Sequence, residues 1–299
     1  MSTNAPSVEP SSRLKADLIL LLVAVVWGSA FAAQRVAAQS MEVFLFNGLR
    51  FLLGALVLLP LALRHKVEAP YPRKLYLPLA LAGILLFGGT SLQQLGMRYT
   101  TAGNAGFITG LYVVLVPVIL AIGWHRTQPR LTWLAAALSA AGLFLLSTGG
   151  TFSLALGDAL ELIGAFLWAF HVLLIGWLVL RVDALHLSVV QYALCASLSM
   201  AAAVIVGGIV PDQAVNAWWA IVYTGVLSIG LGYTLQAVGQ KVAPPADAAI
   251  LLSLEAVFAA LAGWIFLDER LSAIQLVGCG LMLGGMVLVQ IPPILRGHL

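Results

Sequence analysis

Ten apolar stretches, each close to the length that crosses a lipid bilayer, follow one another along this chain. A helix of about 20 residues spans the roughly 30 Å of hydrocarbon in a membrane. Backbone N–H and C=O groups in lipid must be paired within the segment, so each stretch is predicted to be helical. We expect an all-α integral membrane protein with ten transmembrane helices at residues 16–36, 43–63, 75–97, 102–123, 131–148, 158–180, 187–209, 216–238, 245–266 and 273–292.

The composition excludes an ordinary soluble domain. Charged residues form 9% of the chain and hydrophobic residues 61%, whereas about 25% of a soluble domain is charged. The mean hydropathy of +1.01 also favours a lipid environment.

The chain repeats itself. Residues Ser91–Ser147 align without a gap on Thr234–Gln290, at an offset of 143 positions. An offset of 141 extends the match upstream and pairs Trp27 with Trp168. We therefore predict one unit written twice. The predicted division is a disordered cytoplasmic tail at 1–13, a first repeat at 14–148, a second repeat at 149–292 and a short cytoplasmic tail at 293–299.

Each repeat holds five predicted helices, and because five is odd the second repeat must enter the membrane from the opposite side. Inverted repeats let many carriers open a central site to either side of the membrane in turn. The 5+5 arrangement therefore makes transport by alternating access the leading hypothesis.

The basic residues predict the orientation. If both termini are cytoplasmic, eleven Lys and Arg residues fall on the cytoplasmic side and three on the outer side, which is the usual bias. The net charge of +3 reflects this bias and not a nucleic-acid partner. The eleven are Arg13, Lys15, Arg64, Lys66, Arg73, Lys74, Arg126, Arg130, Arg181, Lys241 and Arg296, and the three are Arg35, Arg98 and Arg270.

Three motifs resemble one transporter family. They are Trp27-Gly28-Ser29, the Leu-Tyr-Val-Val-Leu-Val-Pro run at 111–117, and Ser253–Phe258 followed by Leu267–Leu271. In this order they resemble the EamA family of the drug/metabolite transporter superfamily. The resemblance implies ten helices in two inverted halves and export of small metabolites across a bacterial inner membrane. Within the family, the chain is similar to YddG-type exporters of amino acids, including aromatic ones.

Ionisable residues inside the predicted helices are the first candidates for a substrate site, because a charge at mid-membrane is costly and usually faces a cavity. Glu255 would bind a proton or a substrate ammonium, and Arg50 a substrate carboxylate. His171 belongs to the residue type that changes charge near neutral pH. The alternatives are structural, namely a hydrogen bond to a neighbouring helix or a side chain that reaches the interface.

Gln93 and Gln236 are candidates because both repeats keep the same amide at the same place. Two amides related by pseudo-symmetry can hold the polar end of a zwitterion. The alternative is hydrogen bonding between helices.

Aromatic residues form the third group. Trp27, Trp168, Tyr112 and Tyr233, with Tyr99, would build a wall that stacks a ring or an ammonium. Tryptophan and tyrosine near helix ends are more often interfacial anchors. That is the expectation for Trp124, Trp133, Trp218 and Trp219.

The expected cavity is lined by the first, third, fourth, sixth, eighth and ninth helices. The fifth and tenth helices then act as scaffold, with packing faces of small residues at Ala137, Ala141, Gly280 and Gly284. Asp17 and Asp158 are expected in first turns, where a carboxylate complements the helix dipole. Glu161 shares a stripe of the sixth helix with Trp168 and His171.

An amino-acid exporter is the first functional hypothesis. The alternative on the same scaffold is efflux of several drugs, quaternary cations or other metabolites, or lipid flipping. An enzyme is disfavoured, because the chain has no nucleotide-binding glycine loop and no His-Glu-x-x-His helix. Cys195 and Cys279 lack partner spacing, so no metal or cofactor is expected. Proton coupling through Glu255 or His171 stays open, as does the choice between monomer and homodimer.

Overall fold

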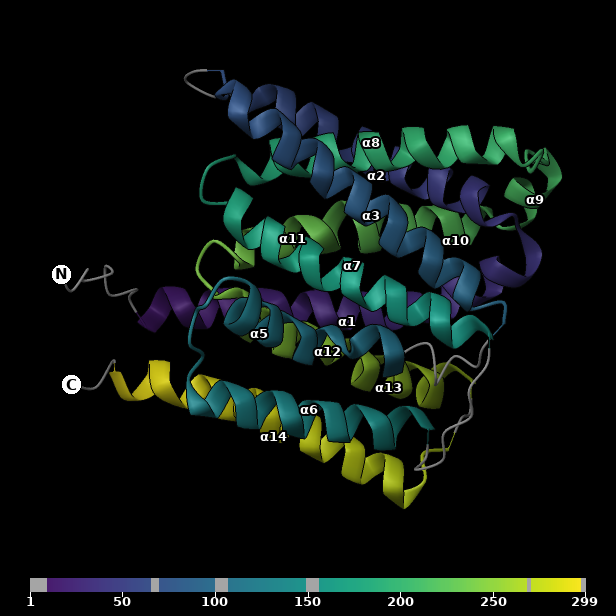
Figure 1. The fold of residues 1–299 in the computed structure, drawn as a ribbon. Coiled ribbons are helices and arrows are strands. Elements are labelled where there is room, and N and C mark those ends of the chain that lie inside the picture. The colour runs from purple at the N-terminus through teal and green to yellow at the C-terminus, as the bar shows by residue number, and fades with distance from the viewer. Residues whose placement is uncertain (1–9, 66–69, 100–106, 149–155, 268–269, 297–299) are drawn as a thin grey trace.

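The computed structural model describes residues 10–65, 70–99, 107–148, 156–267 and 270–296. In these ranges the chain is helical without a strand, and the helices run roughly side by side between two ends of a bundle (Figure 1). Eight described helices are long and apolar enough to cross a membrane, and two shorter apolar helices cover Phe107–Gly123 and Ala273–Val289. The all-helical membrane architecture is thus confirmed.

The helices of the first part of the chain lie on the predicted stretches, with α1 longer than predicted at both ends. They are α1 (Pro10–Ser40), α2 (Val43–Arg64), α3 (Tyr76–Gly96) after the 3-10 turn η1 (Arg73–Leu75), α5 (Tyr112–Gly123) and α6 (Arg130–Thr148).

The second part of the chain is more segmented. Its elements are α7 (Leu156–Leu178), α8 (Ala184–Ile205), α9 (Pro211–Asn216), α10 (Trp218–Tyr223), the π-helix η2 (Thr224–Tyr233), α11 (Thr234–Gly239), α12 (Pro245–Ser253), α13 (Glu255–Leu267) and α14 (Ala273–Arg296).

The first and last helices extend into the stretches predicted as tails. α1 begins at Pro10, inside the tail predicted at 1–13, and proline suits a first helical turn. α14 continues to Arg296, past the predicted helix end at 292. The first turn of α1 and the last turn of α14 lie at the same end of the bundle (Figure 1).

Asp17 does not lie in a first turn, because α1 starts earlier than predicted. Its Oδ2 instead lies 3.0 Å from Nε of Arg13, one turn before it. Nη2 of Arg13 also lies 2.8 Å from Oδ2 of Asp247, in the first turn of α12. These charge-assisted contacts tie α1 to α12. Asp158 does lie in the first turn of α7, as predicted.

Three of the predicted helices, at 102–123, 216–238 and 245–266, are interrupted. The N–H groups of Leu111 and Leu254 each bond to a carbonyl three residues back, at 3.2 Å. These two positions are 143 apart, the offset of the sequence repeat. The third interruption is η2, whose wider π-helical turn is often found at functional sites. Interrupted helices commonly line the substrate sites of carriers.

Close helix contacts recur at equivalent positions of the two repeats. A Cβ on Gly89 of α3 would lie 3.0 Å from the indole of Trp168, and a Cβ on Gly232 of η2 would lie 2.5 Å from that of Trp27. The two glycines differ by 143 positions and the two tryptophans by 141. Only the missing side chain lets each indole approach its neighbouring helix so closely.

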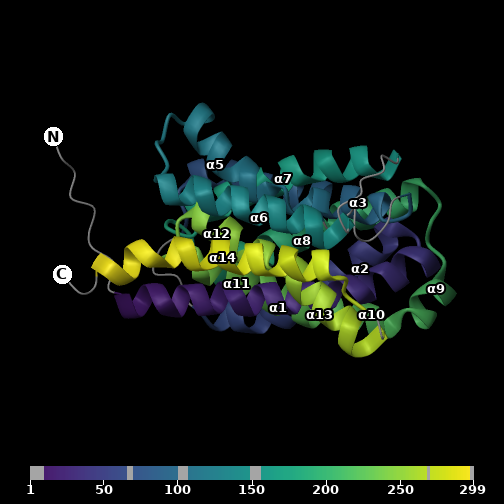
Figure 2. The ribbon, with the colours of Figure 1, turned by 90° about the horizontal axis from the view of Figure 1, so that it is seen from below.

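α6 and α14 lie side by side at one edge of the bundle (Figures 1 and 2). A Cβ on Gly142 of α6 would lie 2.5 Å from the carbonyl oxygen of Gly278. A Cβ on Gly285 of α14 would lie 2.8 Å from the carbonyl oxygen of Ala135. The two backbones therefore meet through glycine.

The small residues predicted as packing faces take no part in this contact. Ala137 and Ala141 are exposed on α6, and a Cβ on Gly280 or Gly284 would meet nothing within 4 Å. α6 and α14 each carry more than one stripe of small residues, and spacing alone does not say which stripe faces the neighbouring helix.

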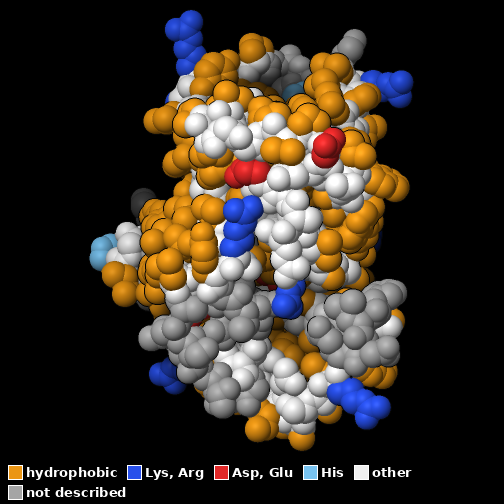
Figure 3. All heavy atoms as spheres, turned by 90° about the vertical axis from the view of Figure 1, so that its right-hand side faces the viewer, with side chains coloured by type: hydrophobic (Ala, Val, Ile, Leu, Met, Phe, Trp, Pro, Cys, Tyr) orange, Lys and Arg blue, Asp and Glu red, His pale blue; other side chains and the backbone are white. Residues whose placement is uncertain are grey.

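The outer surface is largely apolar. Hydrophobic side chains cover both flanks of the bundle in the end-on view, with polar side chains and backbone between them (Figure 3). The tryptophans predicted as interfacial anchors, Trp124, Trp133, Trp218 and Trp219, are all exposed. This distribution is that of a protein surrounded by lipid.

Candidate functional site

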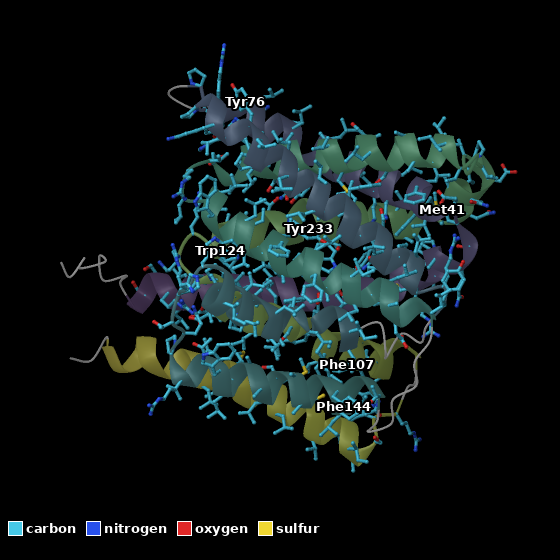
Figure 4. All side chains as sticks on the ribbon, viewed as in Figure 1. Met41, Tyr76, Phe107, Trp124, Phe144 and Tyr233 are labelled. Carbon is cyan, nitrogen blue, oxygen red and sulfur yellow. The ribbon has the colours of Figure 1, made fainter. Side chains whose placement is uncertain are left out.

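All nine residues predicted for a substrate site line a single cavity. The empty space of the cavity and its open mouth together is about 560 Å³. Tyr233 lies near the middle of the bundle, whereas Met41, Tyr76 and Trp124 lie toward its ends (Figure 4). The nine residues are Trp27, Arg50, Gln93, Tyr112, Trp168, His171, Tyr233, Gln236 and Glu255.

Tyr233 is the centre of an aromatic cluster. Its ring centroid lies 4.6 Å from that of Trp27 and 6.1 Å from that of Trp168, which it faces at 16°. Nε1 of Trp27 donates a hydrogen bond to the carbonyl oxygen of Ser228 in η2 at 3.0 Å. Nε1 of Trp168 is buried without a partner among the described residues. The cluster therefore offers a flat apolar wall and one spare N–H donor.

Arg50 brings a positive charge to the cavity. Its side chain is buried, and Nη1 donates to Oε1 of Gln34 at 2.6 Å. The guanidinium lies over the rings of Phe46 and Phe51, at 4.8 and 5.4 Å from their centroids. Within the described ranges Arg50 has no ion-pair partner, and its Nε has no hydrogen-bond partner. A buried charge without a counter-ion is costly, so an anionic group of a ligand would stabilise it.

Tyr112 and Glu255 occupy equivalent positions of the two repeats and meet in the cavity. The Tyr112 hydroxyl donates to Oε1 of Glu255 at 3.2 Å. Each residue directly follows one of the interruptions at Leu111 and Leu254. The lack of a side chain at Gly28 lets the backbone at Glu255 approach α1, since a Cβ on Gly28 would lie 2.5 Å from the carbonyl oxygen of Glu255. The cavity therefore contains a carboxyl group as well as a guanidinium.

The two equivalent amides have different surroundings. Nε2 of Gln93 donates to Oγ1 of Thr109 at 3.4 Å, a long hydrogen bond. Oε1 of Gln236 is buried and has no partner among the residues the structure describes. Both amides thus keep hydrogen-bonding capacity for a ligand.

His171 has a specific protein partner. It is fully buried, and its Nε2 donates to Oε1 of Gln191 at 2.9 Å. Gln191 stands 141 positions after Arg50, at the equivalent place of the second repeat. This contact matches the structural alternative for His171, although the imidazole also lines the cavity.

Sequence reasoning missed part of the lining. Tyr99, which was considered for the aromatic wall, is 55% exposed and does not line the cavity, because it lies beyond the end of α3. The second helix, absent from the six predicted to line the cavity, contributes Arg50. A polar residue within an apolar stretch is a signal that would have found Gln34. The lining residues that were missed are Phe31, Gln34, Thr109, Val172, Ser228, Ile229 and Leu252.

The cavity lining is rich in hydrogen-bonding groups and aromatic rings. The described residues contain no group of three or more His, Cys, Asp or Glu side chains that could hold a metal ion. The lining instead combines amides, rings, one guanidinium and one carboxyl.

The helical bundle, its apolar flanks and its polar central cavity define a multi-pass membrane protein of the transporter class. The chain belongs to the EamA-like transporter family, whose model matches residues 14–148 and again 155–291.

Relatives of the chain are also transporters. A protein of Archaeoglobus fulgidus, described as an uncharacterized transporter, is 31% identical over 95% of this chain and 88% of its own length. YedA of Escherichia coli, described as an uncharacterized inner membrane transporter, is 27% identical over 50% of each chain. A solved crystal structure shares the fold with a TM-score of 0.78 at 20% identity, covering 93% of this chain and 97% of its own.

Proposed function

We propose that this protein is a secondary carrier that exports amino acids, including aromatic and hydrophobic ones, across a bacterial inner membrane. The main support is one cavity that combines a guanidinium with no counter-ion among the described residues, a carboxyl group and stacked rings, from Arg50, Glu255 and the Tyr233 cluster. An amino acid carries a carboxylate, an ammonium and a side chain, which match these three features.

The proposed mechanism is alternating access between two inverted five-helix halves, at 14–148 and 149–292. Equivalent glycine–tryptophan contacts and equivalent interruptions at Leu111 and Leu254 support two related halves, as does the double match to the family model. Ten spans result when the two shorter apolar helices are counted with the eight long ones. Rocking of one half against the other would expose the cavity to each side in turn.

Counterflow tests the function directly. The purified full chain is reconstituted into vesicles loaded with unlabelled L-phenylalanine, and uptake of external labelled L-phenylalanine is followed, with other amino acids as competitors. Arg50→Lys keeps the charge but loses the forked donor geometry, and we expect it to lower the apparent affinity for amino acids by about tenfold, a loss of roughly 1.4 kcal/mol in binding. Absence of counterflow for every amino acid tried would overturn the proposal.

Efflux of quaternary cations is the competing function, because an aromatic cavity with a carboxyl also attracts cations. The buried positive charge of Arg50 opposes it, since like charges repel. Uptake of tetraphenylphosphonium by the same vesicles, with no competition from amino acids, would favour this alternative. Protein-dependent flipping of a fluorescent phospholipid would favour a flippase.

A further inference from the structure

A second carboxyl group lies behind the cavity wall, outside the site described above. Glu161 of α7 is fully buried and does not line the cavity. Its Oε2 accepts a hydrogen bond from Oγ1 of Thr109 at 2.8 Å. Thr109 does line the cavity, and its Oγ1 accepts the hydrogen bond from Nε2 of Gln93 at 3.4 Å. A chain of three side chains therefore connects the cavity to a buried acid.

Packing does not account for Glu161. Its Oε1 is buried without a hydrogen-bond partner among the described residues, which is unfavourable for a polar atom. At the equivalent place of the first repeat, 141 positions earlier, the chain has Leu20. Leu20 packs on Gly239 as Glu161 packs on the equivalent Gly96. An apolar side chain fills this place in one half, so the carboxyl in the other half calls for a functional reason.

We propose that Glu161 is the proton-carrying site that couples proton entry to amino-acid export through Thr109 and Gln93. The inference rests on the proposed export function. An amino-acid zwitterion has no net charge, so the membrane potential does no work on it. Export against a gradient therefore requires exchange with an ion. One proton binds the Glu161 carboxylate from the outer side and leaves toward the cytoplasm for each amino acid that leaves the cell.

The hydroxyl of Thr109 provides the link between the proton and the substrate. While Glu161 is a carboxylate, Thr109 donates its single hydroxyl proton to Oε2, as the structure has it. When the proton binds Oε2, that O–H becomes the donor to Thr109. Thr109 then turns its own proton toward the cavity, because the Gln93 nitrogen beside it is itself a donor. The cavity wall thus presents different hydrogen-bonding groups in the two protonation states, which is the differential interaction that coupling requires.

The position of Glu161 suits a proton that enters from outside. Glu161 lies in the second turn of α7, and α7 begins at the end of the bundle opposite the two chain termini (Figure 1). With both termini in the cytoplasm, this end faces outward. The charged neighbour of Glu161 is Asp158, one turn earlier on α7. Gly96 and Thr109, which contact it from α3 and from the helical turn before α5, do not titrate.

The test measures substrate exchange, by counterflow, separately from the coupling of proton movement to substrate accumulation. Vesicles are prepared with a lumen about one pH unit more acidic than the exterior, which for one proton per substrate supports about tenfold accumulation of labelled L-phenylalanine. We expect Glu161→Gln to keep counterflow within about twofold of the unsubstituted protein while losing accumulation and substrate-driven proton flux, since only coupling needs the titrating group. Thr109→Val should also lower accumulation, and Thr109→Ser should restore it.

Matched variants define the contrary outcomes. Glu255→Gln should instead impair counterflow itself, because Glu255 lines the cavity. Accumulation that survives Glu161→Gln, or that is lost in His171→Gln with counterflow intact, would overturn the assignment. Equal loss of counterflow and accumulation in Glu161→Gln, in protein with an unchanged elution profile, would reduce Glu161 to a structural role. Counterflow without accumulation in the unsubstituted protein would reject proton coupling but leave export standing, whereas no counterflow at all would reject the export function.

Discussion

Tyr112 and Glu255 stand at equivalent positions of the repeat yet carry different side chains, and they hydrogen-bond to each other. Arg50 and Gln191 also differ at equivalent positions, 141 apart, although Gln191 bonds to His171. Equivalent positions of the two halves thus carry different polar side chains.

Gln93 and Gln236 are the polar pair that the two halves share, and their loss should affect transport more than stability. Neither amide makes a short hydrogen bond in the structure. We therefore expect Gln93→Ala and Gln236→Ala each to lower L-phenylalanine counterflow by about tenfold, while the free energy of unfolding falls by less than about 1 kcal/mol. Counterflow and thermal unfolding of the purified variants measure the two effects.

Gln94 is the matched control. It neighbours Gln93 but does not line the cavity, and its Nε2 donates to the carbonyl oxygen of Gln34 at 2.9 Å. Gln94→Ala should lower stability by about 1 kcal/mol and leave the apparent affinity unchanged. Equal loss of folded protein in the Gln93 and Gln236 variants would return both amides to a structural role.

At this scale the candidate site was largely predictable, because a polar residue in an apolar stretch is conspicuous. Arg50, His171 and Glu255 stood out for that reason, and the repeat added the two glutamines. The pairings of these residues with Gln34, Gln191 and Thr109 were not predictable, since the partners come from other helices and only packing brings them together.

At the scale of elements, the packing of α6 on α14 depends on Gly142. Because a Cβ there would lie 2.5 Å from a backbone carbonyl oxygen, Gly142→Ala must push the two helices apart. We expect a loss of about 1–3 kcal/mol in the free energy of unfolding, as for other overpacked interfaces. Thermal unfolding in detergent, followed by loss of monodisperse protein, provides the measurement.

Gly280→Ala is the control on the same helix pair. A Cβ at Gly280 meets nothing within 4 Å, and alanine favours a helix over glycine by up to about 1 kcal/mol. Its thermal midpoint should be unchanged or higher. Equal destabilisation by Gly142→Ala and Gly280→Ala would contradict this account of the interface.

The sequence located the elements better than it located their contacts. Apolar length alone gave α2, α3 and α6 to within one residue at each end. In a membrane bundle, however, lipid-facing and partner-facing sides are both apolar, so the pattern that separates core from surface in a soluble helix is missing. The interruption at Leu254 and the π-helix η2 were also unpredictable, because they depend on hydrogen bonds and close approaches set by neighbouring helices.

At the scale of the whole molecule, a polar cluster joins α2 to the start of α8 at the end that carries the termini. The N-cap residue Asp183 accepts hydrogen bonds from the N–H groups of Leu185 and His186. Its carboxylate also lies 3.3 Å from Nε2 of His65 and 3.1 Å from Nδ1 of His186. Burial raises the pKa of Asp183, but the hydrogen bonds from His186 and Leu185 and the charge of His65 outweigh it, so the pKa lies below its ordinary value.

A lowered carboxyl pKa gives stability that is present above the unfolded-state value and lost as pH falls through the folded-state value. The midpoint temperature of thermal unfolding should therefore decrease as the pH is lowered below 3.8, the ordinary pKa of an aspartate. Asp183→Asn should lower the midpoint at neutral pH and flatten this acid decline. Asp212→Asn, at an exposed position of α9, is the control. An acid decline of equal depth in Asp183→Asn would show that other groups cause it.

The direction of export depends on which end of the bundle faces the cytoplasm, and the basic residues make this testable. Because successive helices run between the two ends, the termini share one end with the α5–α6 connection, which carries the exposed Arg126. α9, with the exposed Asp212, lies at the other end (Figure 1). The excess of Lys and Arg at the first end predicts that it is cytoplasmic. In a variant that lacks Cys195 and Cys279, a membrane-impermeant maleimide applied to intact cells should label Asp212→Cys and spare Arg126→Cys until the cells are permeabilised. Labelling of Arg126→Cys in intact cells, with Asp212→Cys protected, would place the termini outside the cell. Glu161 would then lie near the cytoplasmic end, which would contradict proton entry to it from outside.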